Sequence, residues 1–324
     1  MNGEGNSRPR RVAVLSRSFS AHPVLRAELC ALYPDVTFNE SGRTLGGQEL
    51  LEFVAGHDAI IVALEKLDAQ TLAEMKDVRI IGKYGVGLDN VDLRAAARLN
   101  IKVGWTGGVN RRSVAELAIA QMIALLHRAQ EAASETRSGV WRQLKGRELR
   151  GRTVGILGCG HVGKEVARLL RVFECRVLAH DIRDFPEFYA AQSVTPVSLD
   201  ELLERSEVLT IHLPHTKATH LMLDAKALAR LPAGAVIVNF ARGGILGEEA
   251  LLANLKSGHI GGAALDVFDS EPPANKELLL HPCVLATPHI GGSAEEAVLA
   301  MGRAAIAGLA QASDPLDHIP EWAA

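Results

Sequence analysis

Three polar residues that could together move a proton on a small anion follow apolar segments in the second half of the sequence. Arg242 follows AVIVNFA, Glu271 lies in LDVFDSEPP, and His289 ends CVLATPH. A protonated histidine can donate to an oxygen on which negative charge develops, and a neighbouring carboxylate favours the charged ring and fixes its orientation. An arginine can bind a carboxylate through two parallel hydrogen bonds. These residue types therefore predict acid–base chemistry on an anionic substrate.

The segments that precede these residues predict the strands of a parallel sheet. Helical stretches separate most of them, and they are apolar along their whole length, as strands covered on both faces are. In an open parallel sheet, ligands bind outside the carboxyl ends of the strands. Each polar residue alone could equally be structural, but three at neighbouring strand ends favour a site. The expected strands are residues 153–158, 175–181, 207–213, 235–241, 260–268 and 283–289.

The first half of the sequence predicts a second, smaller α/β region. Strands are expected at 11–16, 58–64, 78–85 and 101–106, with helical stretches between them. A long, largely apolar helix is expected at 113–136. Such a helix needs burial on more than one side, so we expect it to pack against a second subunit as well as its own domain.

A glycine-rich loop indicates a dinucleotide site. Gly158, Gly160 and Gly163 follow an apolar strand and open an amphipathic helix, and Asp181 closes the next strand 18 residues after Gly163. The first glycine permits the tight turn, the second lets the backbone approach the pyrophosphate, and the third lets the helix pack closely on the strand. A glycine-rich turn without a ligand is the weaker alternative. Asp181 can accept from ribose hydroxyls and would repel a 2′-phosphate, which favours NAD over NADP, although Arg183 lies close by.

Composition excludes several classes of protein. The chain has 324 residues, 48% of them hydrophobic, and a net charge of −3 without a basic stripe, so one large or two ordinary domains and no nucleic-acid partner are expected. Its apolar runs fall short of the ~18 residues that a membrane span needs, so no membrane partner is expected either.

Cysteine usage and the first residues bear on the compartment. The four cysteines are scattered without a CxxC pair and no metal-ligand cluster is visible, which favours reduced thiols in a cytoplasmic protein without a bound metal. The start, MNGEGNSRPRR, lacks an apolar core and is expected to be a flexible tail, not a signal peptide.

Four motifs carry a family resemblance. GILGCGHVG, NFARGGILGEEAL, AALDVFDSEPP and LATPHIGGSAEEA resemble the signatures of the D-isomer-specific 2-hydroxyacid dehydrogenases, and KYGVGLDNVDL (83–93) resembles their substrate loop. The resemblance runs from about residue 11 to about residue 312, with the motifs in order, and is to the short, phosphoglycerate dehydrogenase-like form without a regulatory domain.

The resemblance implies a fold, an activity and an assembly. It implies a Rossmann-type doubly wound parallel sheet as the NAD-binding domain, residues 108–292, and a smaller flavodoxin-like α/β substrate domain made of 1–107 and 293–324. It implies NAD-dependent interconversion of a 2-oxo acid and a D-2-hydroxy acid in a cytoplasmic homodimer.

The resemblance also implies residue roles. Arg242 would bind and orient the 2-oxo acid, His289 would transfer the proton, and Glu271 would pair with it. The backbone amides of Val86 and Gly87 would hold the substrate carboxylate. Cofactor contacts carry over to Ala241, to Asp266 at the nicotinamide amide, and to the amides of His161 and Val162 at the pyrophosphate.

Some residues depart from the family pattern. Asn110 stands where formate dehydrogenases also have an asparagine, yet Glu271 stands where those enzymes have glutamine, which favours a 2-oxo acid over formate. Lys83 and one of Arg111 or Arg112 could add positive charge near the mouth of the substrate cleft. This predicts a substrate with a second anionic group, such as a phosphonate, phosphate or carboxylate. The alternative is that these cations face water and that the substrate is small, like pyruvate or glyoxylate.

Two other functions are compatible with the same motifs. Corepressor-like proteins that sense NAD(H) keep the same three polar residues, so the residues alone do not distinguish a binding protein from an enzyme. A formate- or phosphite-type dehydrogenase is the third possibility.

Overall fold

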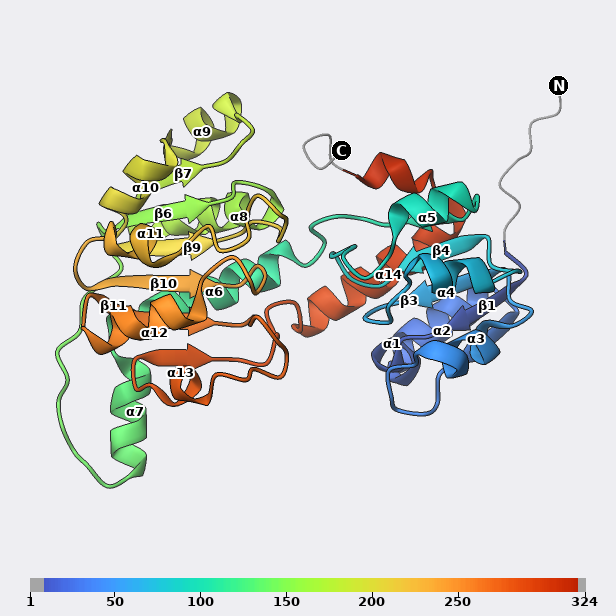
Figure 1. Ribbon diagram of the computed structural model, residues 1–324, viewed down its shortest axis with the longest axis horizontal. Helices are drawn as coiled ribbons and strands as arrows, with labels where there is room; N and C mark the ends of the chain where they lie inside the picture. Colours follow the sequence, from blue (N-terminus) through green and yellow to red (C-terminus); the bar gives the residue numbers. More distant parts are fainter. Residues whose placement is uncertain (1–8, 320–324) are drawn as a thin grey trace. The chain divides into compact units, whose positions relative to one another are not determined.

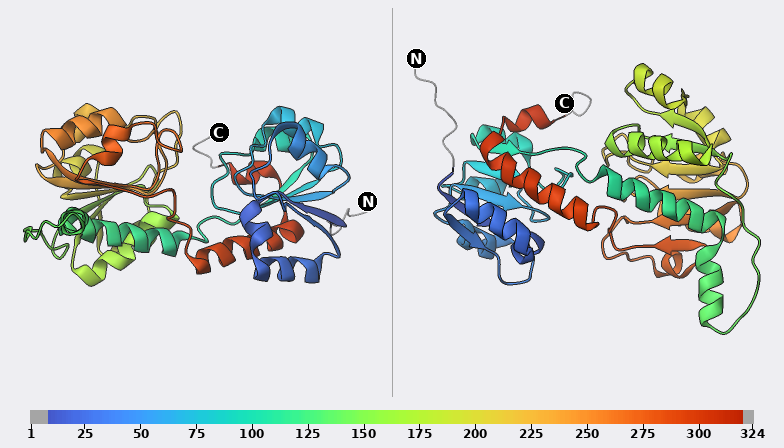
Figure 2. Two further views of the ribbon diagram at one scale, coloured as in Figure 1. Left: turned by 90° about the horizontal axis from the view of Figure 1, so that it is seen from below. Right: turned by 180° about the vertical axis from the view of Figure 1, so that it is seen from behind.

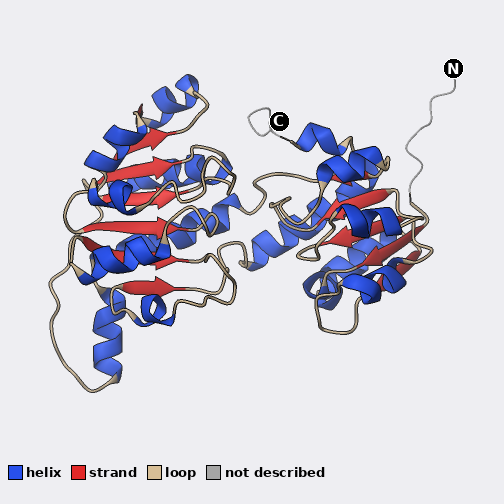
Figure 3. Cartoon of the chain, viewed as in Figure 1, coloured by secondary structure: helices blue, strands red, loops and turns tan. Residues whose placement is uncertain are grey.

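The computed structural model describes residues 9–319 and divides the chain into two compact units. Unit 1 comprises Met1–Asn110 and Glu295–Ala324, and unit 2 comprises Arg111–Ala294. Each unit is built on its own parallel sheet with helices against it (Figures 1 and 3). The expected N-terminal tail falls largely on residues 1–8, which lie outside the described residues.

Unit 2 has a seven-stranded sheet in the order β12-β11-β10-β9-β6-β7-β8, with every pairing parallel. Starting from β8, this is the Rossmann order 3-2-1-4-5-6 with one strand added. The sequence predicted all of these strands except the short edge strand β8. Their bounds are β6 (Thr153–Leu157), β7 (Arg176–His180), β8 (Val194–Pro196), β9 (Val208–Ile211), β10 (Ala235–Asn239), β11 (Ile260–Leu265) and β12 (Val284–Ala286).

Alternate residues of each central strand of unit 2 enter two different cores. Val236 and Val238 of β10 pack with α6 and α8 on one face, whereas Ala235 and Ile237 pack with α10, α11 and α12 on the other. This two-sided burial explains why the strand is apolar without alternation. The helices are α6 (Arg111–Leu126), α7 (Ala129–Arg137), α8 (His161–Leu170), η1 (Arg171–Phe173), α9 (Pro186–Gln192), α10 (Leu199–Arg205), α11 (Ala225–Ala229), α12 (Glu248–Lys256) and α13 (Lys276–Leu280).

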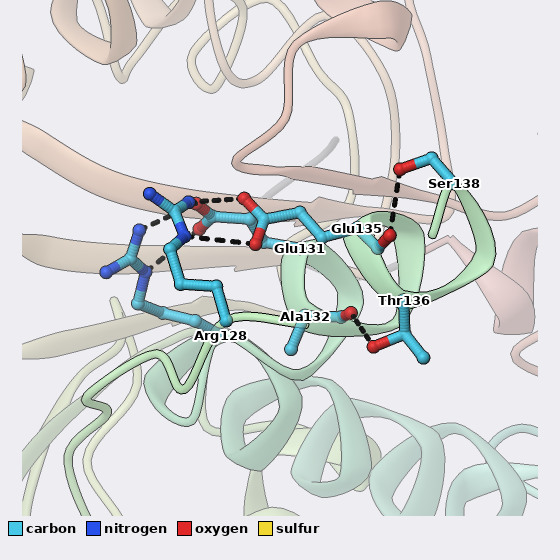
Figure 4. Close-up of polar contacts among 7 residues, drawn as sticks. Arg128, Glu131, Ala132, Glu135, Thr136 and Ser138 are labelled. Atoms are coloured by element: carbon cyan, nitrogen blue, oxygen red, sulfur yellow. Dashed lines mark hydrogen bonds and ion pairs between the residues drawn. The ribbon is translucent and has the colours of Figure 1, made fainter. Parts of the chain in front are cut away.

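The long helix expected at 113–136 is interrupted. α6 ends at Leu126 and α7 begins at Ala129, because Arg128 adopts the left-handed conformation with φ 56°. α7 buries none of its residues within the unit. Arg128 pairs with Glu131 at 2.7 Å, and Arg142 on the returning segment pairs with Glu131 and Glu135, so ion pairs hold this arm, residues 128–142, together (Figure 4).

Unit 1 has a five-stranded parallel sheet in the order β2-β1-β3-β4-β5, the flavodoxin-like order. The edge strand β2 is more polar than its neighbours and was not predicted. The strands are β1 (Arg11–Val14), β2 (Asp35–Phe38), β3 (Ala59–Val62), β4 (Ile80–Lys83) and β5 (Lys102–Gly104). The helices are α1 (Arg17–Ala21), α2 (Pro23–Leu32), α3 (Gly47–Val54), α4 (Ala69–Glu74), α5 (Leu93–Arg98), α14 (Glu295–Gln311) and η2 (Pro315–His318).

The C-terminal helix α14 packs on one face of the sheet that the N-terminal segment forms (Figure 2). Ala305, Ile306 and Leu309 of α14 pack with β1, β3 and β4 in one core. The helix and β5 touch through backbone, since a Cβ added to Gly104 would lie 2.1 Å from the Gly308 carbonyl oxygen. Segments from the two ends of the chain therefore share one domain.

Three other observations concern the described residues. None of their helices combines the length and the hydropathy that crossing a membrane requires. No group of three histidine, cysteine or acidic side chains in residues 9–319 is arranged to hold a metal ion. All four cysteines are free thiols, and burial raises the pKa of Cys159 and of Cys175 to about 11.

Candidate active site

The structure brings His289 and Glu271 together on the loops that follow β12 and β11. The Nδ1 atom of His289 lies 2.9 Å from Oε2 of Glu271, whose Oε1 accepts a hydrogen bond from the Phe268 amide at 3.3 Å. Both side chains are about half exposed, 49% and 41%. Because Nδ1 faces the carboxylate, Nε2 is the ring nitrogen left to meet a substrate.

A cavity of about 450 Å³ adjoins the pair. Apart from Glu271, His289 and Thr287, it is lined by apolar side chains. Its walls are formed by Phe268, Glu271, Pro272, Pro273, Leu279, Ala286, Thr287, Pro288 and His289.

A buried carboxylate fixes the loop that carries His289. Asp266 is 2% exposed; its Oδ1 accepts from the Thr287 hydroxyl at 2.6 Å and the Ile290 amide at 2.8 Å, and its Oδ2 accepts from the Gly291 amide at 2.7 Å. His289 sits between these anchors in the left-handed conformation, φ 56°, which a non-glycine residue adopts only when its surroundings impose it. Asp266, expected at the nicotinamide amide, thus already has a positioning role within unit 2.

A buried asparagine shapes the turn that carries Arg242. Asn239, the last residue of β10, accepts from the Ala241 amide at 3.1 Å and donates through Nδ2 to the Arg242 carbonyl at 3.0 Å. The Arg242 guanidinium donates through Nη1 to the Ala241 carbonyl at 2.7 Å. The sequence analysis did not single out Asn239, although a lone amide inside the run AVIVNFA was the available signal.

The two glycines after Arg242 are required by packing within unit 2. A Cβ on Gly243 would lie 1.9 Å from the Phe268 carbonyl oxygen. Gly244 has φ 74°, and a Cβ there would lie 2.8 Å from Nε2 of His215. Neither position tolerates a side chain, so the ARGG turn lies directly against the segment that leads to Glu271.

The glycine loop has the geometry of a phosphate cradle. Gly158 has φ 96°, and a Cβ on Gly163 would lie 2.1 Å from the Gly158 carbonyl oxygen, so the start of α8 lies against the turn. A Cβ on Gly160 would meet no atom within 4 Å, which leaves its side open. Within residues 9–319, the amides of His161 and Val162 donate to no acceptor. An open glycine beside free amides at a helix N-terminus fits the phosphates of a dinucleotide.

Asp181 links the glycine loop to the end of β7. Its Oδ2 accepts from the Cys159 amide at 2.7 Å, and its Oδ1 accepts from the Arg183 amide at 2.9 Å. The Arg183 guanidinium lies beside it, with Nε 3.9 Å from Oδ1. One carboxylate therefore shapes the cradle and stands at the strand end where a ribose would lie.

Positive charge gathers at the start of α8. Partial burial first, and then the nearby cations Arg111, Lys164 and Arg183, lower the pKa of His161 below its ordinary value. The same cations favour a bound anion.

Lys83 is buried beneath the loop that the sequence analysis expected at the substrate. Its side chain is only 4% exposed, and Nζ donates to the Ala63 carbonyl and, at 2.9 Å, to Oδ1 of Asn90. The lysine turns inward beneath its own loop, and its ammonium does not face water. The loop also holds Val86, whose carbonyl accepts from the Trp105 indole at 3.1 Å.

The remaining candidates lie at the start of α6. Arg112 pairs with Glu116 at 2.5 Å and with Glu165 at 3.1 Å, so its guanidinium is engaged on the surface of unit 2. Arg111 is the first residue of the helix, and Asn110 precedes it at the boundary of the two units. Asn110 is buried, and its Oδ1 finds no donor within the described chain.

Comparison with known proteins agrees with the fold and the motifs. Residues 119–291 match the model of the D-isomer specific 2-hydroxyacid dehydrogenase NAD binding domain, which confirms NAD as the cofactor predicted for this region. The D-3-phosphoglycerate dehydrogenase of Archaeoglobus fulgidus is 40% identical over 259 residues, covering 79% of this chain and 49% of that protein. The hydroxypyruvate reductase of Thermotoga maritima is 37% identical over 264 residues, covering 78% and 84%.

A solved structure matches almost the whole chain. A glyoxylate reductase from Paecilomyes thermophila superimposes with a TM-score of 0.83 at 29% identity, covering 93% of this chain and 94% of that one, which confirms the predicted α/β fold. The chain spans about half the length of the phosphoglycerate dehydrogenases that it matches. The matched domain, the identity to the Thermotoga protein and the shared fold lead to one conclusion: the chain belongs to the D-isomer specific 2-hydroxyacid dehydrogenase family.

Proposed function

We propose that the protein is an NAD-dependent oxidoreductase that interconverts a 2-oxo acid and a D-2-hydroxy acid. The contact of 2.9 Å between His289 Nδ1 and Glu271 Oε2 carries this proposal, because it orients a proton donor in a unit that contains an NAD-binding domain. The names of the relatives, hydroxypyruvate reductase and glyoxylate reductase among them, support the substrate class.

Each residue has a defined task when the 2-oxo acid is reduced. The reduced form of NAD, when bound, would supply the hydride that the carbonyl carbon accepts. As the carbon–oxygen π bond breaks, Nε2 of His289 donates its proton to the oxygen, and the half-exposed ring regains a proton from solvent. Glu271 holds the ring by Nδ1 and stabilises its charged form. Arg242 binds and orients the 2-oxo acid, and the amides of Val86 and Gly87 bind its carboxylate.

The direct test is to follow NADH oxidation with a panel of 2-oxo acids. We expect turnover with at least one of them and little with NADPH. Tight NADH binding without any turnover would instead favour an NAD(H)-sensing binding protein. Reduction of NAD by formate or phosphite, with no activity on 2-oxo acids, would favour the third possibility.

A finer proposal concerns a second anionic group on the substrate. Arg111 is its candidate because it is the first residue of α6 and its charge acts on His161 at the start of α8, whereas Lys83 is buried beneath its loop. Arg111→Ala should lower kcat/KM for phosphonopyruvate or oxaloacetate relative to pyruvate by about ten- to a hundred-fold, as expected for one charge-assisted hydrogen bond. Arg112→Ala is the matched control and should leave the ratio unchanged. If pyruvate is the best substrate and Arg111→Ala does not alter the ratio, the idea fails.

We also propose the roles of the two units, the assembly and the location. Unit 2 is assigned as the NAD-binding domain because it contains the matched residues 119–291, and unit 1 as the substrate domain because it carries Val86 and Gly87. A homodimer in the cytoplasm is supported by the arm, where Trp141 is 87% exposed, and by the free thiols. Light scattering of the wild type and of Trp141→Ala tests the dimer, because removing a contact residue should weaken association.

A further inference from the structure

A buried lysine lies directly beneath the loop of residues 84–89. Lys83 is the last residue of β4, and its Nζ donates to the Ala63 carbonyl and to Oδ1 of Asn90. A Cβ on Gly85 would lie 3.8 Å from Nζ, so the loop runs over the ammonium. Burial of an ammonium is unfavourable unless its donors are used, and here the Ala63 carbonyl and Asn90 Oδ1 accept from it.

Asn90 closes the other end of the same loop. Its Nδ2 donates to the Ala63 carbonyl at 3.1 Å and to the Glu65 carbonyl at 2.6 Å, and its own carbonyl accepts from the Leu67 amide at 2.8 Å. The Ala63 carbonyl thus receives hydrogen bonds from both ends of the loop. Lys83, Asn90 and Ala63 form a closed neck below residues 84–89.

Above this neck, the hydrogen bonds of the loop leave two N–H groups without an acceptor among the described residues. The Trp105 indole holds the Val86 carbonyl oxygen at 3.1 Å. Because a trans peptide is planar, fixing this oxygen fixes the Gly87 N–H in the opposite direction. Among the described residues, no acceptor takes the amides of Val86 or Gly87.

We infer that Lys83 is a positioning residue: by tying the two ends of the loop together, it holds the amides of Val86 and Gly87 in the orientation that binds the substrate carboxylate. The inference rests on the proposed function and reassigns Lys83 from direct substrate contact to loop support. The fixed positive charge beneath the loop also favours an anion above it.

Lys83→Met tests the inference because it keeps the unbranched stem and removes the ammonium. We expect KM for the best 2-oxo acid, and Ki for the carboxylate inhibitor oxamate, to rise about 10- to 100-fold, the scale of a substrate held about 1 Å out of place. The NADH dissociation constant should stay unchanged and kcat should fall less than KM rises. Lys66→Met is the matched control, since Lys66 lies in the same unit with its side chain 80% exposed, and it should change none of these values.

A second variant separates positioning from general instability. Asn90→Leu removes the partner of Lys83, so its effect on KM should not add to that of Lys83→Met in the double variant. Additive effects, or an unchanged KM and Ki in Lys83→Met, would overturn the inference. If Lys83→Met does not fold, Asn90→Leu with Lys83 intact gives the same readouts.

Hydrogen exchange distinguishes this inference from the proposed function. In Lys83→Met, the amides of Tyr84 and Val91, which bond to Val62 and Leu88 at the loop ends, should exchange faster than in the wild type. A wild type that turns over no 2-oxo acid would refute the proposed function, and exchange alone would then decide whether Lys83 holds the loop. Equal exchange in the two proteins would refute the positioning role.

Discussion

Two loops at the carboxyl ends of parallel strands are anchored by buried charges of opposite sign. In unit 2, the carboxylate of Asp266 accepts hydrogen bonds from the loop after β12, including two backbone amides. In unit 1, the ammonium of Lys83 donates to oxygen atoms at the neck of the loop after β4. Asp266 accepts from the backbone amides of Ile290 and Gly291, so the first loop is left with a side chain, that of His289, to meet a substrate. The ammonium of Lys83 accepts from no N–H group, and in the second loop the amides of Val86 and Gly87 have no acceptor among the described residues.

The largest effect is expected when the His289 side chain is removed and Asp266, which holds its loop, is kept. His289→Ala leaves Asp266 with all its donors, so the loop and the affinity for NADH should persist while proton transfer is lost. We expect kcat to fall by about 10²–10⁴, as for removal of a general acid. Steady-state kinetics with NADH titration by fluorescence measures both quantities. Retention of more than about a tenth of wild-type turnover would contradict the assigned mechanism.

The next variant removes the carboxylate of Asp266 and keeps the His289 side chain. Asp266→Asn has the same shape but replaces one acceptor oxygen by a donor, which leaves a buried N–H of the loop without a partner. We expect a loss of roughly 1–3 kcal/mol in the free energy of unfolding. We also expect a fall in kcat of about ten- to a hundred-fold as His289 shifts. Urea unfolding and kinetics check these values, and unchanged kcat would show that the loop keeps its shape without the carboxylate.

A smaller effect is expected at Asp181, a carboxylate that holds the glycine loop and is also expected to face the cofactor. Asp181 accepts from the Cys159 amide and stands where a ribose would lie, so Asp181→Ser should weaken NADH binding and narrow the preference over NADPH. We expect the ratio of kcat/KM for NADH to that for NADPH to fall about tenfold, or roughly 1.4 kcal/mol. A wild type that uses both cofactors equally well would contradict this role.

The smallest effect comes from a partly buried histidine, His212, that carries no charge. Burial lowers the pKa of His212 to about 3 from an ordinary value of 6.5, so the ring is neutral in the folded protein. As pH falls below about 6.5, the unfolded chain takes up a proton that the folded chain does not, and stability falls by at most roughly 1.4 kcal/mol per pH unit. Denaturant unfolding at several pH values measures how the free energy of unfolding changes with pH. This dependence should be less steep in His212→Asn than in the wild type. Equal slopes would assign the acid sensitivity to other groups.

The sequence predicted most of the fold because the central strands of both sheets are covered on both faces, and such strands are continuous apolar runs. It missed β2 and β8 because edge strands carry polar residues such as Asp35 and Thr195. It missed the break at Arg128 because hydropathy does not report a left-handed residue. It proposed Lys83 as a cation for the substrate, and only the positions of Asn90 and Ala63 show that the ammonium has buried acceptors.

The pairing of Glu271 with His289 could be anticipated from their strand ends, but the groups that hold them could not. Asp266 was noticed through a motif and assigned to the cofactor, and Asn239 was overlooked. Asp266 accepts from backbone amides 24 and 25 residues further along the chain, which no local spacing predicts. Asn239 bonds to backbone two and three residues ahead, a local contact of the kind asparagine often makes in turns.

The position of α14 has a consequence for how the chain acquires its structure during synthesis. The first five strands leave the ribosome early, but the helix that covers Val12, Ile61 and Ile80 begins only at Glu295. At ordinary translation rates the delay is on the order of ten seconds or more. Throughout that interval α1 and α2 cover only part of this face of the nascent sheet of unit 1, and the part that α14 will cover stays exposed, whereas the helices of unit 2 emerge interleaved with its strands. The newly made N-terminal half is therefore the segment on which a chaperone that binds apolar surface should act, and its release should coincide with completion of the last helix.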